Sequence, residues 1–157
     1  MKHKKSIILW GIVVALMIGI FYMSSQPATK SNETSYKLIG EIANIINPGY
    51  SRMTPIEKKT INSRYNLITR KITHATVYFF LAAFSLAALG LHIRFRKNRV
   101  QLALIICMLF AISDELHQRF VPGRSAHLTD VLIDLAGATL AIFIGSITHR
   151  TNSYHIK

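Results

Sequence analysis

Four apolar stretches, each close to the length of a membrane-spanning helix, constrain the fold more than any other feature of the sequence. They cover residues 6–23, 72–93, 100–118 and 131–147. A helix needs about 20 largely apolar residues to cross the roughly 30 Å hydrocarbon core of a bilayer. The third stretch reaches this length only if the helix continues beyond Ser113 through the polar residues 114–118. We therefore predict an all-α membrane protein with four transmembrane helices, forming one domain over residues 1–157.

The chain is strongly basic, and the positions of the charges indicate what kind of surface it meets. It carries 19 Lys and Arg against 7 Asp and Glu, which gives a formal net charge of +12. In a soluble protein this excess would favour nucleic acid as a partner. Here the basic residues lie mostly at the margins of the apolar stretches, and no arginine-rich stripe alternates with aromatic residues. We therefore predict contact with a lipid surface and no nucleic-acid partner.

The first apolar stretch follows the basic sequence Met-Lys-His-Lys-Lys, an arrangement that a cleaved signal peptide also has. At about 18 residues, however, the stretch is longer than the apolar part of a signal peptide, which has roughly 7–15. No clear cleavage site with the pattern small-x-small follows it. We therefore predict that it remains in the protein as a membrane anchor.

Basic residues in the short polar segments predict the orientation in the membrane. Four crossings place the N-terminal segment, the link between the second and third stretches, and the C-terminal tail on one side. The basic residues of these segments are Lys2, Lys4, Lys5, Arg94, Arg96, Lys97, Arg99, Arg150 and Lys157. Residues 24–71 hold eight basic residues, but these are spread along the segment and offset by three glutamates. Because short cytoplasmic segments are enriched in Lys and Arg, we predict cytoplasmic termini, with residues 24–71 and 114–130 outside.

The segment 24–71, between the first two apolar stretches, has helical patterns of its own. Apolar residues recur at helical spacing from Tyr36 to Ile46, and Asn47-Pro48-Gly49 ends this run. Thr54-Pro55-Ile56-Glu57 is a capping box with proline at the first helical position, and the apolar pattern after it leads into the second stretch. We predict two amphipathic helices lying along the outer leaflet. The alternative is a small soluble cap packed on its own apolar faces.

Polar residues lie at one end of the last three apolar stretches, on faces that small residues continue deeper in the membrane. Lys71, His74 and Tyr78 open the second stretch, Asp114 and Gln118 close the third, and Asp130 and Asp134 open the fourth. The small residues are Ala82, Ser85, Ala103, Cys107, Ala111, Gly137, Ala141 and Gly145. Because ionisable groups are costly inside a bilayer, we predict that these helices pack through their small faces and gather the polar groups around one pocket.

Five short motifs stand in order along the chain. They are Ser24-Ser25-Gln26, Lys71-x-x-His74-x-x-x-Tyr78, Asp114-Glu115-x-His117-Gln118, Pro122-Gly123-Arg124 and Asp130-x-x-x-Asp134-x-x-Gly137. Together they resemble the VanZ-like family of bacterial membrane proteins over essentially the whole chain, although residues 27–70 hold no recognised motif. The resemblance implies a bacterial plasma-membrane protein associated with lower susceptibility to glycopeptide antibiotics, chiefly teicoplanin-like lipoglycopeptides. It implies no particular reaction.

The candidate site residues are His74, Tyr78, Asp114, Glu115, His117, Gln118, Arg124, Asp130 and Asp134. Three interpretations of them stay open. The acids pair with Arg119 and Arg124 in a clasp, with Arg124 folded back against Asp114, Glu115 or Asp130. Alternatively, Arg124 and His74 bind an anionic lipid head group, an envelope precursor or the lipoglycopeptide itself. In the third interpretation the protein is a small membrane hydrolase or transferase acting on a lipid-linked substrate.

The motifs of well-known catalytic sites are missing from the chain. It has no His-Glu-x-x-His zinc motif, no nucleophile elbow and no phosphate-binding glycine loop. We therefore expect neither a metal nor a cofactor. Whether the protein is an enzyme stays open at this point.

Overall fold

The computed structural model describes the backbone of residues 1–154 and the side chains of residues 1–146. Over these residues the chain forms the helices α1 (Lys2–Ser24), α2 (Ala28–Ile46), η1 (Pro48–Arg52), α3 (Pro55–Gly90), α4 (Arg96–Gln118) and α5 (Leu128–Tyr154), where η1 is a short 3-10 helix. Four of them, α1, α3, α4 and α5, are long and apolar enough to cross a membrane. The predicted all-α fold with four transmembrane helices is therefore confirmed. Arg150 and Lys157, two of the basic residues used to predict the orientation, lie outside the residues whose side chains are described.

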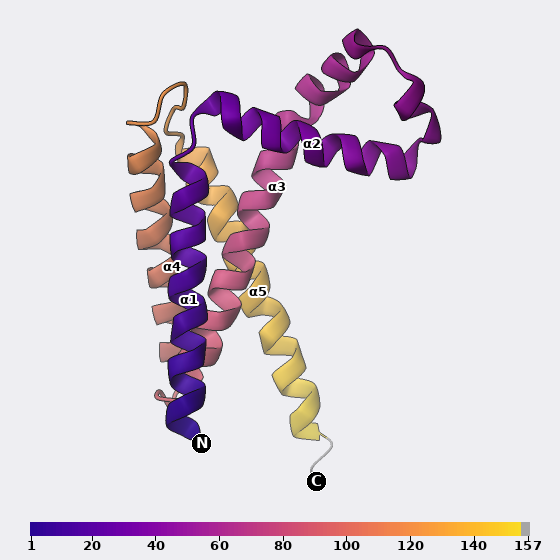
Figure 1. Ribbon diagram of the computed structural model, residues 1–157. Coiled ribbons are helices and arrows are strands. Elements are labelled where there is room, and N and C mark those ends of the chain that lie inside the picture. Colours follow the sequence, from indigo (N-terminus) through magenta and orange to yellow (C-terminus); the bar gives the residue numbers. More distant parts are fainter. Residues whose placement is uncertain (155–157) are drawn as a thin grey trace.

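The long helices form a bundle with two different ends (Figure 1). The N-terminus and the last described turns of α5 lie at one end, as four crossings require. At the other end, which we call the cap end, α2 runs across the bundle. The helix α3 is central, because it contacts α1, α2, α4 and α5, and its most extensive packing is against α5.

The cap consists of α2, η1 and residues 55–69 of α3, and it projects to one side of the bundle (Figure 1). Asn47 ends α2, and its side chain accepts a hydrogen bond from the backbone of the following turn. The predicted capping box is confirmed, because Thr54 and Glu57 bond to each other's backbone N–H groups. The two arms of the cap are joined by a hydrogen bond of 2.8 Å from Asn66 Nδ2 to Asn32 Oδ1.

Residues 55–71, predicted to form an amphipathic helix that leads into the second apolar stretch, are the first turns of α3 and continue into its membrane-spanning part without a break. No glycine or proline occurs between Pro55 and Gly90, so nothing in the sequence breaks the helix. At 36 residues it is roughly 54 Å long, well beyond the roughly 30 Å of a hydrocarbon core. Its first turns must therefore extend beyond the membrane when the rest spans it. That the cap lies along the outer leaflet stays a prediction.

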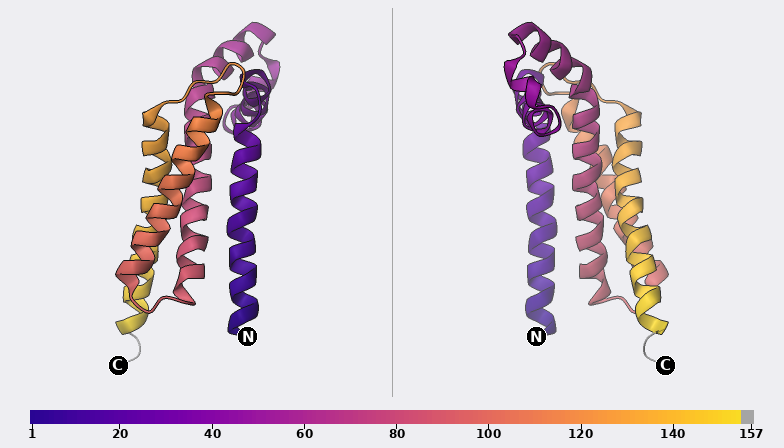
Figure 2. Two further views of the ribbon diagram at one scale, coloured as in Figure 1. Left: turned by 90° about the vertical axis from the view of Figure 1, so that its left-hand side faces the viewer. Right: turned by 90° about the vertical axis from the view of Figure 1, so that its right-hand side faces the viewer.

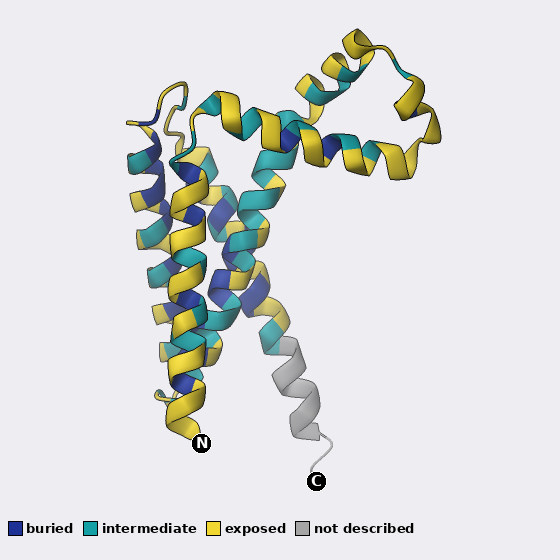
Figure 3. Cartoon of the chain, in the orientation of Figure 1, coloured by how far each residue is buried: buried dark blue, intermediate teal, exposed yellow. Residues whose placement is uncertain are grey.

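The helices α3, α4 and α5 pack through the faces predicted from their small residues (Figure 3). The buried residues of these faces are Tyr78, Ala82 and Ser85 on α3, Ala103, Cys107 and Ala111 on α4, and Asp134, Gly137 and Ala141 on α5. Small side chains let the helix axes approach closely, which replaces the hydrophobic driving force that is missing between helices in lipid. This packing fixes the polar residues at the cap end relative to one another.

The closest approach of two helices is at Gly137, where α5 crosses α3. A Cβ atom added to Gly137 would lie 2.1 Å from the carbonyl oxygen of Ala75, so only glycine fits. The predicted close contact is not found at Gly145, where an added Cβ would lie 3.7 Å from the Leu86 side chain, an ordinary contact distance. The reason is visible in Figure 1, in which α5 diverges from α3 toward the end that carries the termini.

The helix α1 lies at the edge of the bundle, beside α3 and α4 (Figure 2). Only Ser6, Val13, Ile20 and Ser24 are buried among its residues. The first three are spaced by about two helical turns and Ser24 lies one turn beyond Ile20, so they form one narrow stripe. Most of the remaining apolar surface of α1 is exposed, as expected for a helix that faces lipid.

Candidate functional site

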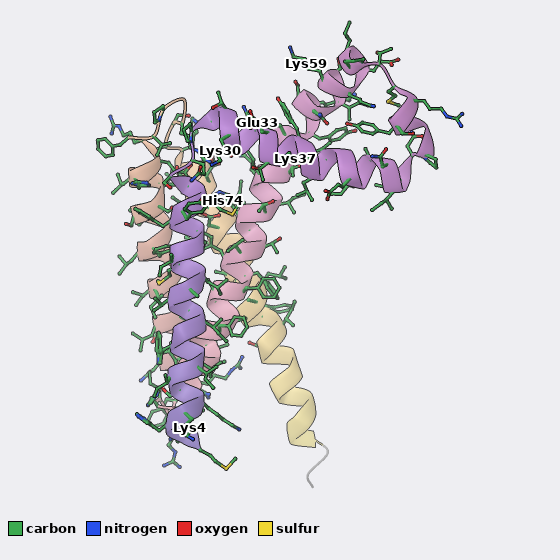
Figure 4. The ribbon with its side chains drawn as sticks, in the orientation of Figure 1. Lys4, Lys30, Glu33, Lys37, Lys59 and His74 are labelled. Atoms are coloured by element: carbon green, nitrogen blue, oxygen red, sulfur yellow. The ribbon has the colours of Figure 1, made fainter. Side chains whose placement is uncertain are left out.

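The polar residues of the predicted site lie at the cap end, where α1 and α4 end and α5 begins. Figure 4 labels His74 there, below α2, and Lys4 at the opposite end of the bundle. A cavity of about 140 Å³, which we call the polar cavity, lies among α3, α4, α5 and the loop between α4 and α5. Its lining includes Arg70, Lys71, His74, Glu115, Gln118, Arg124, Ser125, His127, Asp130 and Asp134. Six of the nine candidate residues therefore line one cavity.

Three candidate residues lie outside this lining. Tyr78 is fully buried one turn below His74, and its hydroxyl group has no hydrogen-bond partner in the part of the chain that the structure describes. His117 faces α1, and its ring stacks on Phe21 with 4.1 Å between the ring centroids. The position next to Gln118 is turned about 100° around a helix, which explains why His117 and Gln118 face different neighbours. The third residue, Asp114, is buried between α1 and α4.

The first group of polar residues joins α1 to α4, and we call it the clasp. Ser24 Oγ donates a hydrogen bond of 2.6 Å to Asp114 Oδ2. Gln118 Nε2 donates to the same oxygen at 3.0 Å and to Ser24 Oγ at 3.2 Å. All three side chains are buried, with Ser24 fully so. Ser24 belongs to the motif Ser24-Ser25-Gln26 but was not among the candidate site residues, and the structure shows it as a direct partner of Asp114.

Arg124 connects the clasp to the loop between α4 and α5. Its Nη1 donates to Gln118 Oε1 at 3.0 Å, its Nε to the Gln26 carbonyl oxygen at 3.0 Å, and its Nη2 to the Met23 carbonyl oxygen at 3.2 Å. The carbonyl groups at a helix end have no partner within the helix and carry partial negative charge, so they attract a cation. The predicted pairing of Arg124 with an acid is therefore wrong, because neutral oxygens at the end of α1 hold the guanidinium.

Burial lowers the pKa of Arg124 from its usual value, and the positive charge of Arg70 lowers it further. Asp114 and Glu115 act in the opposite direction. Since an arginine in a protein stays protonated, the guanidinium remains charged. The loop presents it through a turn at Gly123, whose φ of 74° favours glycine. Arg124 is thus a fixed positive charge at the edge of the polar cavity.

A second group of polar residues lies between α3 and α5. Lys71 Nζ is 3.3 Å from Asp130 Oδ1, and both side chains are one third exposed. His74 Nδ1 is 3.7 Å from Asp134 Oδ1, and the Asp134 side chain is 1% exposed. Neither carboxylate oxygen of Asp134 accepts a hydrogen bond from any of the described residues. These acids face partners on α3, whereas the predicted partner Arg119 is exposed at the end of α4.

Glu115 is held by the loop instead of by a basic side chain. Its Oε2 accepts a hydrogen bond of 2.9 Å from the backbone N–H of His127. The loop is also tied to the start of α2, because the Ala28 N–H donates to the Pro122 carbonyl oxygen at 3.2 Å. The loop therefore has contacts with α1, α2 and α4, which place its side chains against the cavity.

A second pocket, which we call the basic pocket, adjoins the polar cavity between α1, α2 and α3. It measures about 320 Å³, and Arg70, His74 and Arg124 line both spaces. Its lining also includes Gln26, Lys30, Ser31, Thr34, Ser35, Thr69 and Thr73, and it contains no Asp or Glu. Arg70 forms no salt bridge or side-chain hydrogen bond among the described residues, and Arg124 pairs with no carboxylate.

The role of Arg70 was not predicted, although a signal for it exists in the sequence. Arg70 precedes His74 by four residues, and residues four apart share a helix face. With His74 as a candidate site residue, this spacing makes Arg70 a candidate for the same site. Lys30 had no such signal, because its position depends on how α2 crosses the bundle. Among the described residues, no three His, Cys, Asp or Glu side chains are grouped closely enough to hold a metal ion.

Comparison with known proteins identifies the family. A family model described as VanZ/LLP1 matches residues 9–149 of the chain. No curated protein and no solved structure matches significantly. The matched region contains all nine candidate residues and all four membrane-spanning helices except the ends of α1 and α5. By this match over nearly its whole length, the chain belongs to the VanZ/LLP1 family.

Proposed function

We propose that this multi-pass membrane protein binds an anionic group of an envelope lipid, a lipid-linked precursor or a lipoglycopeptide in the basic pocket. In this proposal the cap end faces outward from the bacterial plasma membrane, both termini are cytoplasmic, and binding lowers susceptibility to teicoplanin-like antibiotics. The observation that carries the proposal is that Arg70, Arg124, His74 and Lys30 line one pocket without any acid.

The chemistry of the pocket favours a phosphate or carboxylate as the anionic group. A guanidinium offers several N–H donors in a plane that matches both groups. Arg70 has no acidic partner, and the positive charge of Arg124 faces only neutral acceptors. Two such cations repel each other, and an anion between them relieves the repulsion. Hydroxyl groups of Ser31 and Thr69 in the same lining supply further donors.

The acids of the polar cavity do not oppose this assignment. Asp130 is paired with Lys71, Asp134 faces His74, and Glu115 accepts a backbone N–H. Each of these three acids thus has a local partner, and none of them lines the basic pocket. The first turn of α2, which includes Lys30 and Ser31, adds the positive end of a helix dipole to the basic side.

Substitution of Arg70 tests the proposal, because this side chain has no structural partner to lose. We expect Arg70→Gln to lower the affinity for phosphatidylglycerol in neutral nanodiscs about tenfold, the size of one hydrogen bond to a charged group. At equal expression it should also raise susceptibility to teicoplanin. Arg64→Gln is the matched control, since Arg64 lies on the same helix, is exposed and lines neither space. Equal lipid binding by wild type and Arg70→Gln would contradict the proposal.

A second candidate function is hydrolysis or group transfer on a lipid-linked substrate, and the His74–Asp134 pair favours it. Asp134 faces Nδ1 of the imidazole at 3.7 Å, which leaves Nε2 as the nitrogen available for proton transfer with a bound molecule. The same histidine lines the basic pocket. A change in lipid mass after incubation with wild type, absent with His74→Asn, would favour this function. Unchanged lipid with both proteins would leave binding as the function.

A further inference from the structure

An apolar groove runs between α1 and α3 on the side of the bundle that faces lipid. It measures about 630 Å³, within the roughly 300–1,000 Å³ typical of ligand pockets. It is lined by Ile12, Ala15, Leu16, Gly19, Ile20, Tyr22, Met23, Thr73, His74, Val77 and Tyr78. Most of these side chains are hydrocarbon, and the exceptions are Tyr22, Met23, Thr73 and His74 at the cap end and the hydroxyl group of Tyr78. The groove follows the membrane-spanning part of both helices.

Small residues on α1 keep the groove open. A Cβ atom added to Gly19 would meet no atom within 4 Å, and Ala15 lies one turn away on the same face. Val13 and Ile20 are buried in the core cluster that includes Tyr78 and Leu81 of α3, and Ile20 also lines the groove. Figure 2 shows α1 standing at the edge of the bundle, where it contacts α3 and α4. The groove is therefore a feature of the helix surfaces and needs no movement of the bundle to exist.

The groove ends at the site proposed above. His74 lines the groove, the basic pocket and the polar cavity, and Thr73, Tyr22 and Met23 line both the groove and the basic pocket. A molecule with its anionic group between Arg70 and Arg124 would thus have an apolar path leading away from it into the membrane. Figure 4 places His74 where α1, α2 and α3 meet.

From this continuity we infer that the ligand is an anionic membrane lipid, with its head group in the basic pocket and one hydrocarbon chain in the groove between α1 and α3. The head-group half of this inference rests on the proposed function, and the position of the chain is new. A water-soluble anion would leave the groove without a use. A chain attached to the anion fits a groove that has carbon along its walls and cations at its end.

The groove acts by admitting the chain, not by attracting it. Hydrocarbon gains little when it leaves other hydrocarbon for an apolar protein surface. A lipid head group, however, can reach the pocket only if the attached chain has room beside it. Filling the groove should therefore exclude the lipid by steric hindrance and leave a free head group unaffected. This difference separates the chain position from the head-group position.

Two glycines of α1 provide the test and its control. Gly11 and Gly19 both have open space beside Cα, but only Gly19 lines the groove. We expect Gly19→Phe to lower the affinity for dioleoyl phosphatidylglycerol about tenfold while leaving that for glycerol 1-phosphate unchanged, because only the chain meets the ring. Gly11→Phe should change neither affinity, and Arg70→Gln should lower both. Native mass spectrometry of the full chain, released from a neutral detergent, measures all of these affinities.

Any other result would contradict either the chain position or the head-group site. Wild-type binding of phosphatidylglycerol by Gly19→Phe, with weaker binding by Arg70→Gln, would overturn the chain position and keep the head-group site. Equal loss of both probes in Gly19→Phe would also overturn it. No loss of either probe in Arg70→Gln would refute the proposed function itself. If Gly19→Phe does not fold, a phosphatidylglycerol with a photoreactive chain can be used on wild type. Its label should concentrate in residues 12–23 and 73–78, and equal labelling of α4 and α5 would overturn the inference.

Discussion

Asp114 and Asp134 are buried to the same degree at the same end of the bundle, but their surroundings are built in opposite ways. Each is 1% exposed. Asp114 accepts two hydrogen bonds on one oxygen, from Ser24 at 2.6 Å and from Gln118 at 3.0 Å. Asp134 accepts none, and its nearest basic group is the His74 ring at 3.7 Å. Asp134 lines the polar cavity, whereas Asp114 does not.

This difference indicates that Asp114 stabilises the fold and that Asp134 has a functional role. Burying a carboxylate is costly unless hydrogen bonds compensate for the lost water. Around Asp114 neutral donors from two helices supply them to Oδ2, while Oδ1 has no partner among the described residues, and the group works as a clasp. Around Asp134 neither oxygen accepts a hydrogen bond from the described residues, and a buried charge with so little compensation is typical of a functional position. The clasp was expected to be ionic, but most of it is made of neutral groups.

The largest effect should come from the contact that brings Asp134 and His74 together. Gly137 lies nearly one turn below Asp134, and a Cβ there would lie 2.1 Å from the backbone oxygen of Ala75. We expect Gly137→Ala to push α5 away from α3, to lower stability in detergent by about 3 kcal/mol and to separate the His74–Asp134 pair. Gly145→Ala is the control, because its new Cβ meets only an ordinary contact at 3.7 Å. Similar melting temperatures for the two variants would show that the crossing is not tight.

The main helices could be predicted because the relevant physics is local. Apolar length predicts a membrane helix, and small residues at helical spacing predict its packing face, which is why Ala103, Cys107 and Ala111 are all buried as expected. The cap was predicted less well. The capping box at Thr54 marked the start of a helix correctly, but where that helix ended depended on the absence of any break before Gly90.

The clasp provides the next prediction. Asp114→Ala removes the shared acceptor of Ser24 and Gln118, so two buried hydrogen bonds are lost. The Ser24 hydroxyl group then has no acceptor, whereas Gln118 Nε2 keeps its bond of 3.2 Å to Ser24 Oγ. We expect a loss of about 2 kcal/mol of stability, from two buried hydrogen bonds of ~1 kcal/mol each. Thermal unfolding in detergent measures it. Ser25→Ala is a suitable control, since the hydroxyl of Ser25 only bonds to the Tyr22 carbonyl on its own helix. An Asp114→Ala variant as stable as wild type would mean that the clasp does not hold α1.

The partners of the clasp show where the sequence reaches its limit. Ser24 and Asp114 are separated by 90 residues, and no local pattern connects them. Arg124 was expected to pair with an acid because charge was the only visible criterion. Two of its three partners are the main-chain carbonyl groups of Met23 and Gln26, and every residue of a chain has such a group. Only the arrangement of the helices selects which of them Arg124 meets.

The smallest effect on stability, and the sharpest test of the comparison, is expected for Asp134→Asn. Because Asp134 accepts no hydrogen bond, removing its charge should change stability by less than about 1 kcal/mol in either direction. If Asp134 serves the site through His74, the same variant should lose protection against teicoplanin at equal expression. Asp114→Asn is the matched control and should show the reverse, lower stability with protection reduced only as far as the amount of folded protein falls. Loss of stability in Asp134→Asn equal to that in Asp114→Asn would mean that both acids hold the fold. A stable and fully protective Asp134→Asn would instead remove the α3–α5 pair from the site and leave the basic pocket, with Arg70 and Arg124, as the part of the cap end that acts.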